Sequence, residues 1–301
     1  MSKNVIKSYK GFNKDMQCRG FQYEVGKEYD MDGEIKCCNR GFHACKSPLE
    51  VWDYYDMLNS RYAEVEQTGK IDEEEKSTKV CSSHIKIKAE LKLADIINIG
   101  VEWLKDITSP FKVKTDGVLN DNGGKKKQIG SSGDSAKIGS SGDSAKIGSS
   151  GYSAQIGSSG DSAKIGSSGY SAKIGSSGDS AQIGSSGDYA KIGSSGYSAK
   201  IGSSGYSAQI GSSGYSAKIG SSGYSAQIDS TGDDSVIMCA GNKSKAKAKI
   251  GSWITLSEWK WNDVKKRRVP VCVKTEYVDG NYIKADTWYQ LKNGEFVEVT
   301  E

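Results

Sequence analysis

The sequence predicts a mixed α/β N-terminal domain, then an all-β solenoid of nine-residue repeats with about two repeats per coil, and a C-terminal β cap. Three observations support this prediction. A strict nine-residue repeat fills the middle of the chain, a segment of ordinary globular composition precedes it, and alternating apolar segments follow it. The expected boundaries are 1–112 for the α/β domain, 113–128 for a junction, 129–240 for the solenoid and 241–301 for the cap.

Twelve copies of the unit Ile-Gly-Ser-Ser-Gly-(Asp/Tyr)-Ser-Ala-(Lys/Gln), the last one degenerate, run from Ile129 to Val236. A flexible Gly/Ser linker has no reason to hold Ile and Ala in phase over so many copies, so we interpret the repeat as structural. In a strand that contains Ala-Lys-Ile, the Ala and Ile side chains point to one side and the Lys side chain to the other. The Gly-Ser-Ser-Gly segment is then expected to form the corner, where glycine supplies positive φ angles.

Two copies per coil would give six coils, stacked about 4.8 Å apart into a rod roughly 29 Å long. The core is expected to be thin, with stacked Ile and Ala and room for Ser, so the coil-on-coil ladders must supply most of the stability. An open solenoid end exposes an unpaired strand edge, and both flanking segments are therefore expected to act as caps.

The flanking segments have recognisable elements of their own. Strands are expected over 6–9, 62–65 and 84–89, where apolar residues alternate. One helix is predicted from Ser47 and Pro48 through Leu58 and a second over 94–105, from capping residues and helical apolar spacing. After the repeats, strands are expected over 252–261, 269–277 and 282–291, with turns over 278–281 and at Asn293-Gly294.

Composition excludes several classes of protein. No run of 18 or more apolar residues occurs, which argues against a membrane-spanning helix and a membrane partner. The first residues carry no apolar segment after their charges, so we expect no secretion signal. Seven cysteines, an odd number, then indicate reduced thiols and a cytoplasmic location in the host cell.

Neither a metal nor a cofactor is expected. The nine-residue period resembles that of calcium-binding β-rolls, but half of the copies carry Tyr where a calcium site would need a carboxylate. Cys37, Cys38, His43 and Cys45, with Cys18 upstream, lack the spacing of a zinc knuckle, so we interpret these cysteines as free thiols. No nucleophile elbow, phosphate loop or zinc-protease motif occurs either.

Two basic clusters follow the repeats, at 243–249 and 265–268, with Trp253, Trp259 and Trp261 between them. Aromatic residues among cations are typical of a nucleic-acid or acidic-partner patch. The net charge of +4 over 301 residues is too small for a strong phosphate-binding field, so we do not expect nucleic acid as the partner. The candidate residues of this patch are Lys265, Lys266, Arg267 and Arg268.

The Asp/Tyr position of the repeat is expected to form exposed corners. With two copies per coil, Tyr197 and Tyr215 should stack on one edge of the solenoid, and Tyr206 and Tyr224 on the other. Because tyrosine is enriched at protein interfaces, these four residues are candidate self-association residues of a homo-oligomer, with a two-fold dimer favoured.

Three features of the chain together resemble a family of uncharacterised phage and prophage proteins. They are the segments 9–26 and 40–55, which include Arg-Gly-Phe-His-Ala-Cys and Pro-Leu-Glu-Val-Trp-Asp-Tyr-Tyr, and a tail containing Asp-Thr-Trp-Tyr at 286–289. Similar proteins carry Ser/Gly-rich nine-residue repeats between these segments. The resemblance implies a viral or prophage origin and an intracellular site of action.

The N-terminal domain also looks like the Gly-x-Tyr-Phe-Ala segment of ADP-ribosyltransferases, through Gly41-Phe-His-Ala and the tyrosines that follow. This resemblance implies that His43 occupies the place of the NAD-stacking Tyr of that family. The candidates for its catalytic Glu are then Glu64, Glu66 and Glu90. Because His43 replaces that Tyr, we expect the domain to bind a partner rather than to transfer ADP-ribose.

These observations favour a non-catalytic, phage-encoded binding protein that acts on a host macromolecule, with a host protein as the partner and host antiviral defence as the target. Two alternatives stay open: an ADP-ribosyltransferase-like enzyme based on the N-terminal domain, and a structural or spacer protein of the virion.

Overall fold

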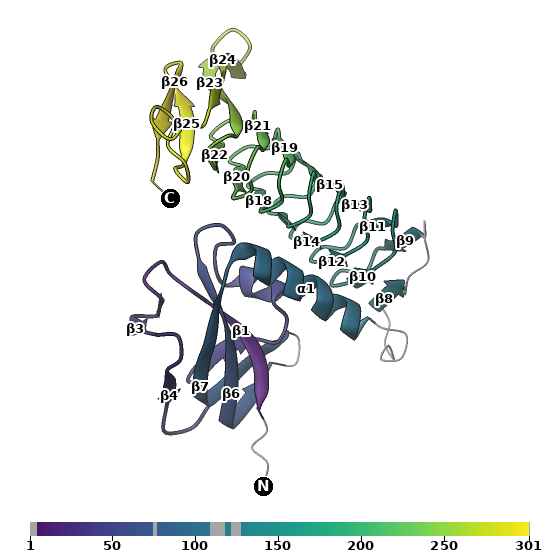
Figure 1. The fold of residues 1–301 in the computed structure, drawn as a ribbon, viewed down its shortest axis with the longest axis vertical. Helices are drawn as coiled ribbons and strands as arrows, with labels where there is room; N and C mark the ends of the chain where they lie inside the picture. Colours follow the sequence, from purple (N-terminus) through teal and green to yellow (C-terminus); the bar gives the residue numbers. More distant parts are fainter. Residues whose placement is uncertain (1–4, 75–76, 109–117, 122–127, 301) are drawn as a thin grey trace. The chain divides into compact units, whose positions relative to one another are not determined.

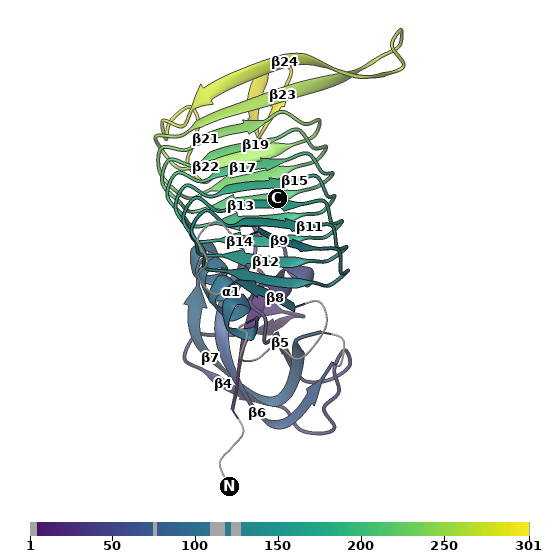
Figure 2. The ribbon, with the colours of Figure 1, turned by 90° about the vertical axis from the view of Figure 1, so that its right-hand side faces the viewer.

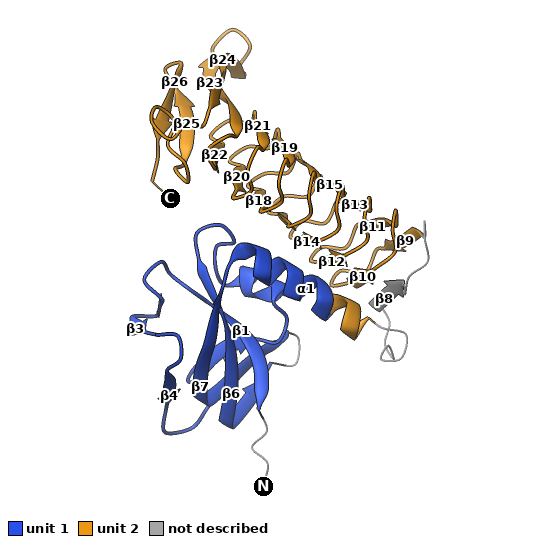
Figure 3. Cartoon of the chain, in the orientation of Figure 1, with its two compact units in different colours: residues 1–103 blue, residues 104–301 orange. Residues whose placement is uncertain are grey.

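A computed structural model describes residues 5–74, 77–108, 118–121 and 128–300 (Figure 1). The chain divides into two compact units, residues 1–103 and 104–301 (Figure 3). The first unit is mixed α/β, and the second contains a β-solenoid with a β cap. The predicted fold class is therefore confirmed.

The N-terminal unit is built around an antiparallel sheet with the strand order β4-β7-β5-β1-β6. Because β7 also pairs with β6, the strands β7, β5, β1 and β6 form a closed ring. A separate two-stranded sheet joins β2 to β3. The strands are β1 (Ile6–Phe12), β2 (Gln17–Cys18), β3 (Phe21–Gln22), β4 (Glu28–Asp30), β5 (Phe42–Cys45), β6 (Arg61–Glu73) and β7 (Lys79–Leu91).

The strands predicted over 6–9, 62–65 and 84–89 all exist, as parts of β1, β6 and β7. Alternation identified them because one side of each strand packs into an apolar core. That core contains Phe12, Phe42, Val65 and Ile87 among its buried residues.

Of the two predicted helices, one is confirmed and one is much shorter than expected. Helix α1 (Leu93–Ile107) covers the expected range 94–105 and buries Ile96, Ile97 and Val101 on one face. The helix expected through Leu58 is only a 3-10 helix, η1 (Leu49–Asp53). The chain turns instead because the Asp56 carboxylate accepts hydrogen bonds from the backbone N–H groups of Leu58 and Asn59.

The solenoid consists of two parallel ladders whose strands alternate along the chain, so that one coil contains 18 residues and two repeats, as predicted. The ten-stranded sheet contains β8 (Val118–Asp121), β10 (Lys137–Ser140), β12 (Gln155–Ser158), β14 (Lys173–Ser176), β16 (Lys191–Ser194), β18 (Gln209–Ser212), β20 (Gln227–Ser230) and β22 (Lys245–Ala248). The nine-stranded sheet contains β9 (Gln128–Ser131), β11 (Lys146–Ser149), β13 (Lys164–Ser167), β15 (Gln182–Ser185), β17 (Lys200–Ser203), β19 (Lys218–Ser221) and β21 (Val236–Cys239).

The core of the solenoid is a stack of small side chains. The Ile side chains are at most 4 % exposed over Ile138–Ile237, and the Ala of each repeat is also buried. The second residue after each Ile is the strand Ser, which points inward as well. Ile, Ala and Ser therefore fill the interior, and Lys or Gln at the start of each strand lies outside it.

The corner differs from the prediction. Each strand is (Lys/Gln)-Ile-Gly-Ser, so the first Gly and the first Ser of Gly-Ser-Ser-Gly belong to the strand and the turn centres on the following (Asp/Tyr)-Ser. In most of these turns the positive φ falls on the Ser, as at Ser162 (φ 56°) and Ser198 (φ 53°), and on none of the repeat glycines of the described chain. This backbone conformation is held from the next coil, because Ser162 N–H donates to the Asp179 carbonyl at 2.7 Å.

The second glycine of each repeat is required for a different reason, which is the close contact between coils. A Cβ atom at Gly187 would lie 1.8 Å from the carbonyl oxygen of Gly169, one coil earlier, and one at Gly205 would lie 1.9 Å from that of Gly187. The same contact recurs from Gly151 to Gly241. Only a residue without Cβ lets consecutive turns stack at this distance.

The first strands of the C-terminal cap extend the ladders of the solenoid, and the later strands cover its end. The ladders extend past residue 240 through β22 and the first part of β23 (Trp253–Asn262), and β8 adds a strand before the repeats. The solenoid thus has about seven turns rather than the six expected from the repeats alone. The remaining strands of the cap pair antiparallel, and they are β24 (Arg267–Tyr277), β25 (Tyr289–Lys292) and β26 (Glu295–Glu298).

The prediction of a strand over 282–291 was wrong for its first part, since regular strand pairing starts only at Tyr289. The Asp279 carboxylate accepts hydrogen bonds from the N–H groups of Asn281 and Ile283, and Asp286 adopts a φ of 55°. These local turns bend the segment over the end of the solenoid, where Ile283 is buried in the same apolar core.

Our first prediction compares two glycines of one repeat. Gly187→Ala should lower the free energy of unfolding by about 1–3 kcal/mol, because its Cβ collides with the Gly169 carbonyl oxygen. Gly184→Ala should raise it by about 0.5–1 kcal/mol, since nothing lies within 4 Å of its Cβ and alanine restricts the unfolded chain. Urea unfolding followed by circular dichroism measures both, and equal effects would contradict the assigned coil contact.

Our second prediction concerns the thin core. Ile183→Asp places a carboxylate at a position that is 4 % exposed, and should cost on the order of 3–5 kcal/mol. Lys200→Gln, on the exposed side of the next strand of the same sheet, should leave the unfolding midpoint unchanged. If both variants unfold at the wild-type urea concentration, the assigned strand register is incorrect.

Candidate functional site

The solenoid carries a continuous row of tyrosines on the edge where the nine-stranded sheet passes into the ten-stranded sheet. Consecutive ring centroids are 5.1, 5.1, 5.5 and 5.3 Å apart. The first four rings are exposed, by 42–55 %. We call this row the tyrosine ladder, and its members are Tyr152, Tyr170, Tyr189, Tyr206 and Tyr224.

The opposite edge is acidic at first and aromatic later. Asp161 and Asp179 hold the turns there, since the Asp179 N–H donates to the Asp161 carboxylate at 2.9 Å and the Tyr197 N–H donates to the Asp179 carboxylate at 2.7 Å. Tyr197 then stacks on Tyr215 at 5.5 Å with nearly parallel rings. The side chain of Tyr215 hydrogen bonds to Asp234.

The predicted stacking of Tyr197 on Tyr215 and of Tyr206 on Tyr224 is confirmed. Sequence analysis missed Tyr189, which joins the two halves of the tyrosine ladder. In its repeat the order is Asp188-Tyr189 rather than Tyr-Ser, so the ring starts one position later along the chain. Because Tyr189 takes the left-handed conformation of the usual Ser (φ 53°), its ring still reaches its neighbours at Tyr170 and Tyr206.

The geometry of the tyrosine ladder decides what it can bind. At the two ends of the ladder the rings stack nearly parallel, at 13° for Tyr152–Tyr170 and 5° for Tyr206–Tyr224, whereas Tyr189 meets Tyr170 at 48° and Tyr206 at 61°. Stacking covers ring faces of the parallel pairs, which leaves their ring edges and hydroxyl groups for a partner. Bases and sugars bind through ring faces, and the faces covered within the stacked pairs are not available to them. A row of exposed hydroxyls on apolar rings is instead suited to a protein surface.

A shallow groove of about 930 Å³ runs along the exposed side of the nine-stranded sheet. Its floor contains strand glycines such as Gly184 and Gly202, at which an added Cβ would meet open space. One side carries a row of exposed lysines in register, interrupted once by Gln182. Within the described chain none of these lysines forms an ion pair, and they are Lys146, Lys164, Lys200 and Lys218.

The N-terminal unit contains a buried amine next to a thiol. Lys10 is 3 % exposed, and its Nζ donates to the His43 carbonyl oxygen at 3.0 Å and lies 3.5 Å from Cys18 Sγ. The rings of Phe12 and Tyr23 lie with their centroids 5.5 Å from the same nitrogen. Burial lowers the pKa of Lys10, because the charged form loses its hydration.

His43 lies on β5, and its side chain is occupied by a local contact. Its Nε2 accepts a hydrogen bond from the Cys38 N–H at 3.0 Å, and burial lowers its pKa. The neighbouring Cys37 contacts Asp72 instead: its N–H donates a hydrogen bond to the Asp72 carboxylate, and its thiol donates one to the Asp72 carbonyl oxygen. Over the part of the chain that the structure describes, no group of three or more His, Cys, Asp and Glu side chains is arranged to hold a metal ion.

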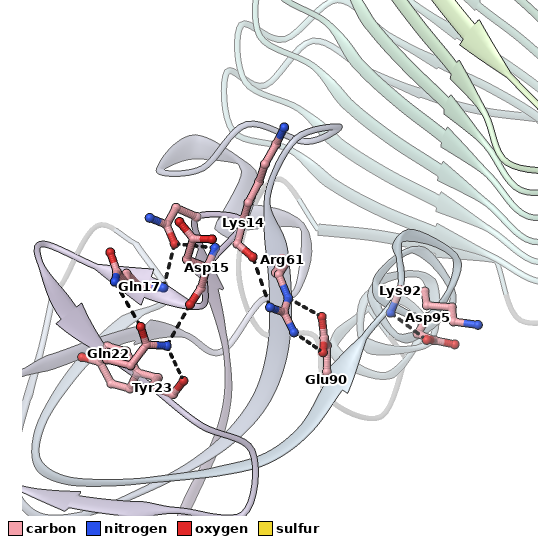
Figure 4. A network of polar contacts seen from close by, with 10 residues as sticks. Lys14, Asp15, Gln17, Gln22, Tyr23, Arg61, Glu90, Lys92 and Asp95 are labelled. Carbon is pink, nitrogen blue, oxygen red and sulfur yellow. Dashed lines mark hydrogen bonds and ion pairs between the residues drawn. The ribbon is translucent and has the colours of Figure 1, made fainter. Parts of the chain in front are cut away.

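The three glutamates named as catalytic candidates lie on other strands and are paired with cations. Glu64 and Glu66 are on β6, and β1 separates that strand from β5 in the sheet. Glu90 is on β7, nine residues or roughly 30 Å along that strand from the residue paired with His43. The ion pairs are Lys7–Glu64 at 2.9 Å, Lys88–Glu66 at 3.1 Å and Arg61–Glu90 at 2.6 Å, the last shown in Figure 4.

The two basic clusters differ in their surroundings. In the 243–249 cluster, which includes β22, Lys247 pairs with the buried Asp229 at 3.1 Å and Lys249 with Asp286 at 2.7 Å. Burial raises the pKa of Asp229 to about 6. The second cluster, Lys265–Arg268, lies at the turn between β23 and β24 and the start of β24, and no ion pair is formed there within the described chain.

Comparison with known proteins relates part of the N-terminal unit to a family. Residues 6–99 match the family described as domain of unknown function (DUF7666). This match spans β1 to the first half of α1 and stops before the solenoid. The comparisons with curated proteins and with solved structures gave no match. No helix among the described residues is long and apolar enough to cross a membrane.

Our third prediction concerns Lys10. Because its pKa is lower in the folded protein than in the unfolded chain, the unfolded chain binds more protons between these two values, and stability rises with pH across that window. Lys10→Met keeps a similar side-chain volume and removes this titration. The variant should therefore gain less stability than the wild type as the pH rises toward the ordinary lysine pKa of 10.5. Urea unfolding at several pH values measures the difference, and parallel curves for both proteins would contradict it.

Proposed function

We propose that this chain is a non-catalytic binding protein that recognises a host protein through the tyrosine ladder. The observation that carries the proposal is the ladder itself, a row of five tyrosines, four of them exposed, on a rigid scaffold. A rigid scaffold favours binding, since little conformational entropy is lost on association.

A phage or prophage origin and action in the host cytoplasm belong to the same proposal. They follow from the resemblance of the repeats and both flanking segments to phage proteins. A phage-encoded protein that binds a host protein without catalysis acts by occupying its surface, and a component of host antiviral defence is the target that we propose.

Self-association through the tyrosines is part of the proposal. Tyr206 and Tyr224 lie on one edge of the solenoid and Tyr197 and Tyr215 on the other. Two copies related by a two-fold axis could bury one edge of each against the other. A homodimer is the simplest assembly of this kind.

Our fourth prediction tests the tyrosine contact. Changing Tyr197, Tyr206, Tyr215 and Tyr224 together to Asp should convert a dimer into a monomer, because it places carboxylates in the contact. The fold should persist, since other copies of the repeat already carry Asp at this position. Sedimentation equilibrium measures the mass. The matched control changes Lys146, Lys164, Lys200 and Lys218 to Gln, which lowers the net charge by the same four units.

A monomeric wild type would remove the self-association, and a dimer that survives the tyrosine changes would move the contact elsewhere. Capture of host proteins from lysate by the wild type, compared with the tyrosine variant, tests the partner. Two further measurements test the alternatives: transfer of label from NAD that is lost in His43→Ala would indicate an enzyme, and recovery of the chain in purified particles would indicate a virion protein.

A further inference from the structure

The β23–β24 ribbon runs past the end of the neighbouring solenoid strands, as Figure 2 shows. As far as Leu256, β23 pairs with β21 and is part of the last coil. From Ser257 to Asn262, the described partner of β23 is β24 alone. The ribbon therefore ends in a two-stranded arm that stands clear of the solenoid.

The base of this arm is fixed. Trp259 Nε1 donates to the Ala240 carbonyl oxygen at 3.0 Å and to Ser257 Oγ at 2.8 Å, which ties the arm to the turn after β21. Lys260 pairs with Glu258 at 3.1 Å on the same stretch. The arm is thus held in one direction before any ligand binds.

The tip of the arm carries concentrated positive charge. Lys265, Lys266, Arg267 and Arg268 are all exposed, and within the described chain none of their side chains forms an ion pair. The tip has one carboxylate, on Asp263, and it accepts a hydrogen bond from Trp261 Nε1 at 3.0 Å. Four consecutive unpaired cations destabilise a hairpin by mutual repulsion, which an anionic ligand would relieve.

The four cations are distributed over both faces of the ribbon and its turn, and not over one face alone. Arg267 and Arg268 are successive strand residues, so they point to opposite faces of the ribbon. Lys265 and Lys266 lie in the turn between the strands. At the apex, Val264 is 93 % exposed. The matching ligand therefore presents negative charge on two sides of a groove that a ribbon can enter.

We propose that the tip of the β23–β24 arm binds in the major groove of double-stranded DNA. This groove is about 12 Å wide, admits a two-stranded β-ribbon and has a row of phosphates along each wall. Phosphates on one wall would meet Arg267 and those on the other Arg268, with Val264 toward the base edges. A flat lipid surface or a one-sided acidic patch would meet only one face, and the major groove of an RNA duplex is too narrow.

This site does not depend on the tyrosine ladder or on a protein partner. The net charge, which disfavours nucleic acid as the partner, averages over the whole chain. The structure separates the two basic clusters: in the 243–249 cluster Lys247 and Lys249 are paired with acids, whereas the 265–268 cluster forms no ion pair within the described chain and lies at a projecting tip.

Our fifth prediction tests the DNA site with the full chain. Fluorescence anisotropy should show binding of a labelled duplex DNA, with a slope of log K against log salt of about −3.6 for four phosphate contacts. K265Q/K266Q/R267Q/R268Q should abolish most of this binding and most of the slope. The matched control is K146Q/K164Q/K200Q/K218Q, which removes the same charge from the groove of the nine-stranded sheet and should bind like the wild type.

Several results would overturn the proposal. Equal loss of binding in both quadruple variants would mean that overall charge is responsible, and absence of duplex binding by the wild type would remove the site. Stronger binding to vesicles containing phosphatidylserine than to duplex DNA would assign the tip to a membrane surface. Thermal unfolding of each variant checks that the fold is intact. The tyrosine variant should bind DNA normally, so failure of the proposed function leaves this test unaffected.

Discussion

The stacking of one coil's glycine on the carbonyl group of the coil before it is the constraint on which the rest of this structure depends. It recurs from Gly151 to Gly241 at a Cβ-to-oxygen distance that no other residue would tolerate. Because each contact joins residues 18 apart, it fixes the coil length and the register together. Ile then stacks on Ile and Ser on Ser, because the backbone contact has already set the register. The side chains of the core are small, so their packing alone would not determine that register.

Exact stacking also determines the surface chemistry. Every exposed position of the repeat becomes a row with a period of one strand spacing, about 4.8 Å. Tyrosine gains from this arrangement, since neighbouring rings fall at stacking distance, whereas like charges in a row repel. The rows of the solenoid reflect this difference: the tyrosine ladder is unbroken over five coils, and the lysine row is interrupted by Gln182.

The cap pairs the open strand edges at the C-terminal end of the solenoid in two different ways. β25 pairs with β22, and β26 pairs with β25, and this end of the chain brings Ile283 and Leu291 into the stacked core. β24 instead pairs with β23 and extends it beyond the core, which leaves a ribbon that contributes little to burial. A two-stranded ribbon is only marginally stable by itself, so the part beyond Leu256 contributes little to the stability of the fold. A role in binding accounts for this segment better than a role in folding does.

The sequence by itself determined the solenoid, its two repeats per coil, the C-terminal β cap and the stacked tyrosine pairs. A strict period transmits one local geometry to every copy of the repeat. It did not determine the corner, since Gly-Ser-Ser-Gly fits both a positive-φ turn and a close backbone contact, and only the neighbouring coil distinguishes them. It also missed Tyr189, and it treated Lys243–Lys249 and Lys265–Arg268 alike. Whether a charge is paired depends on residues distant in the chain, such as Asp229 and Asp286, which only the tertiary structure brings into contact.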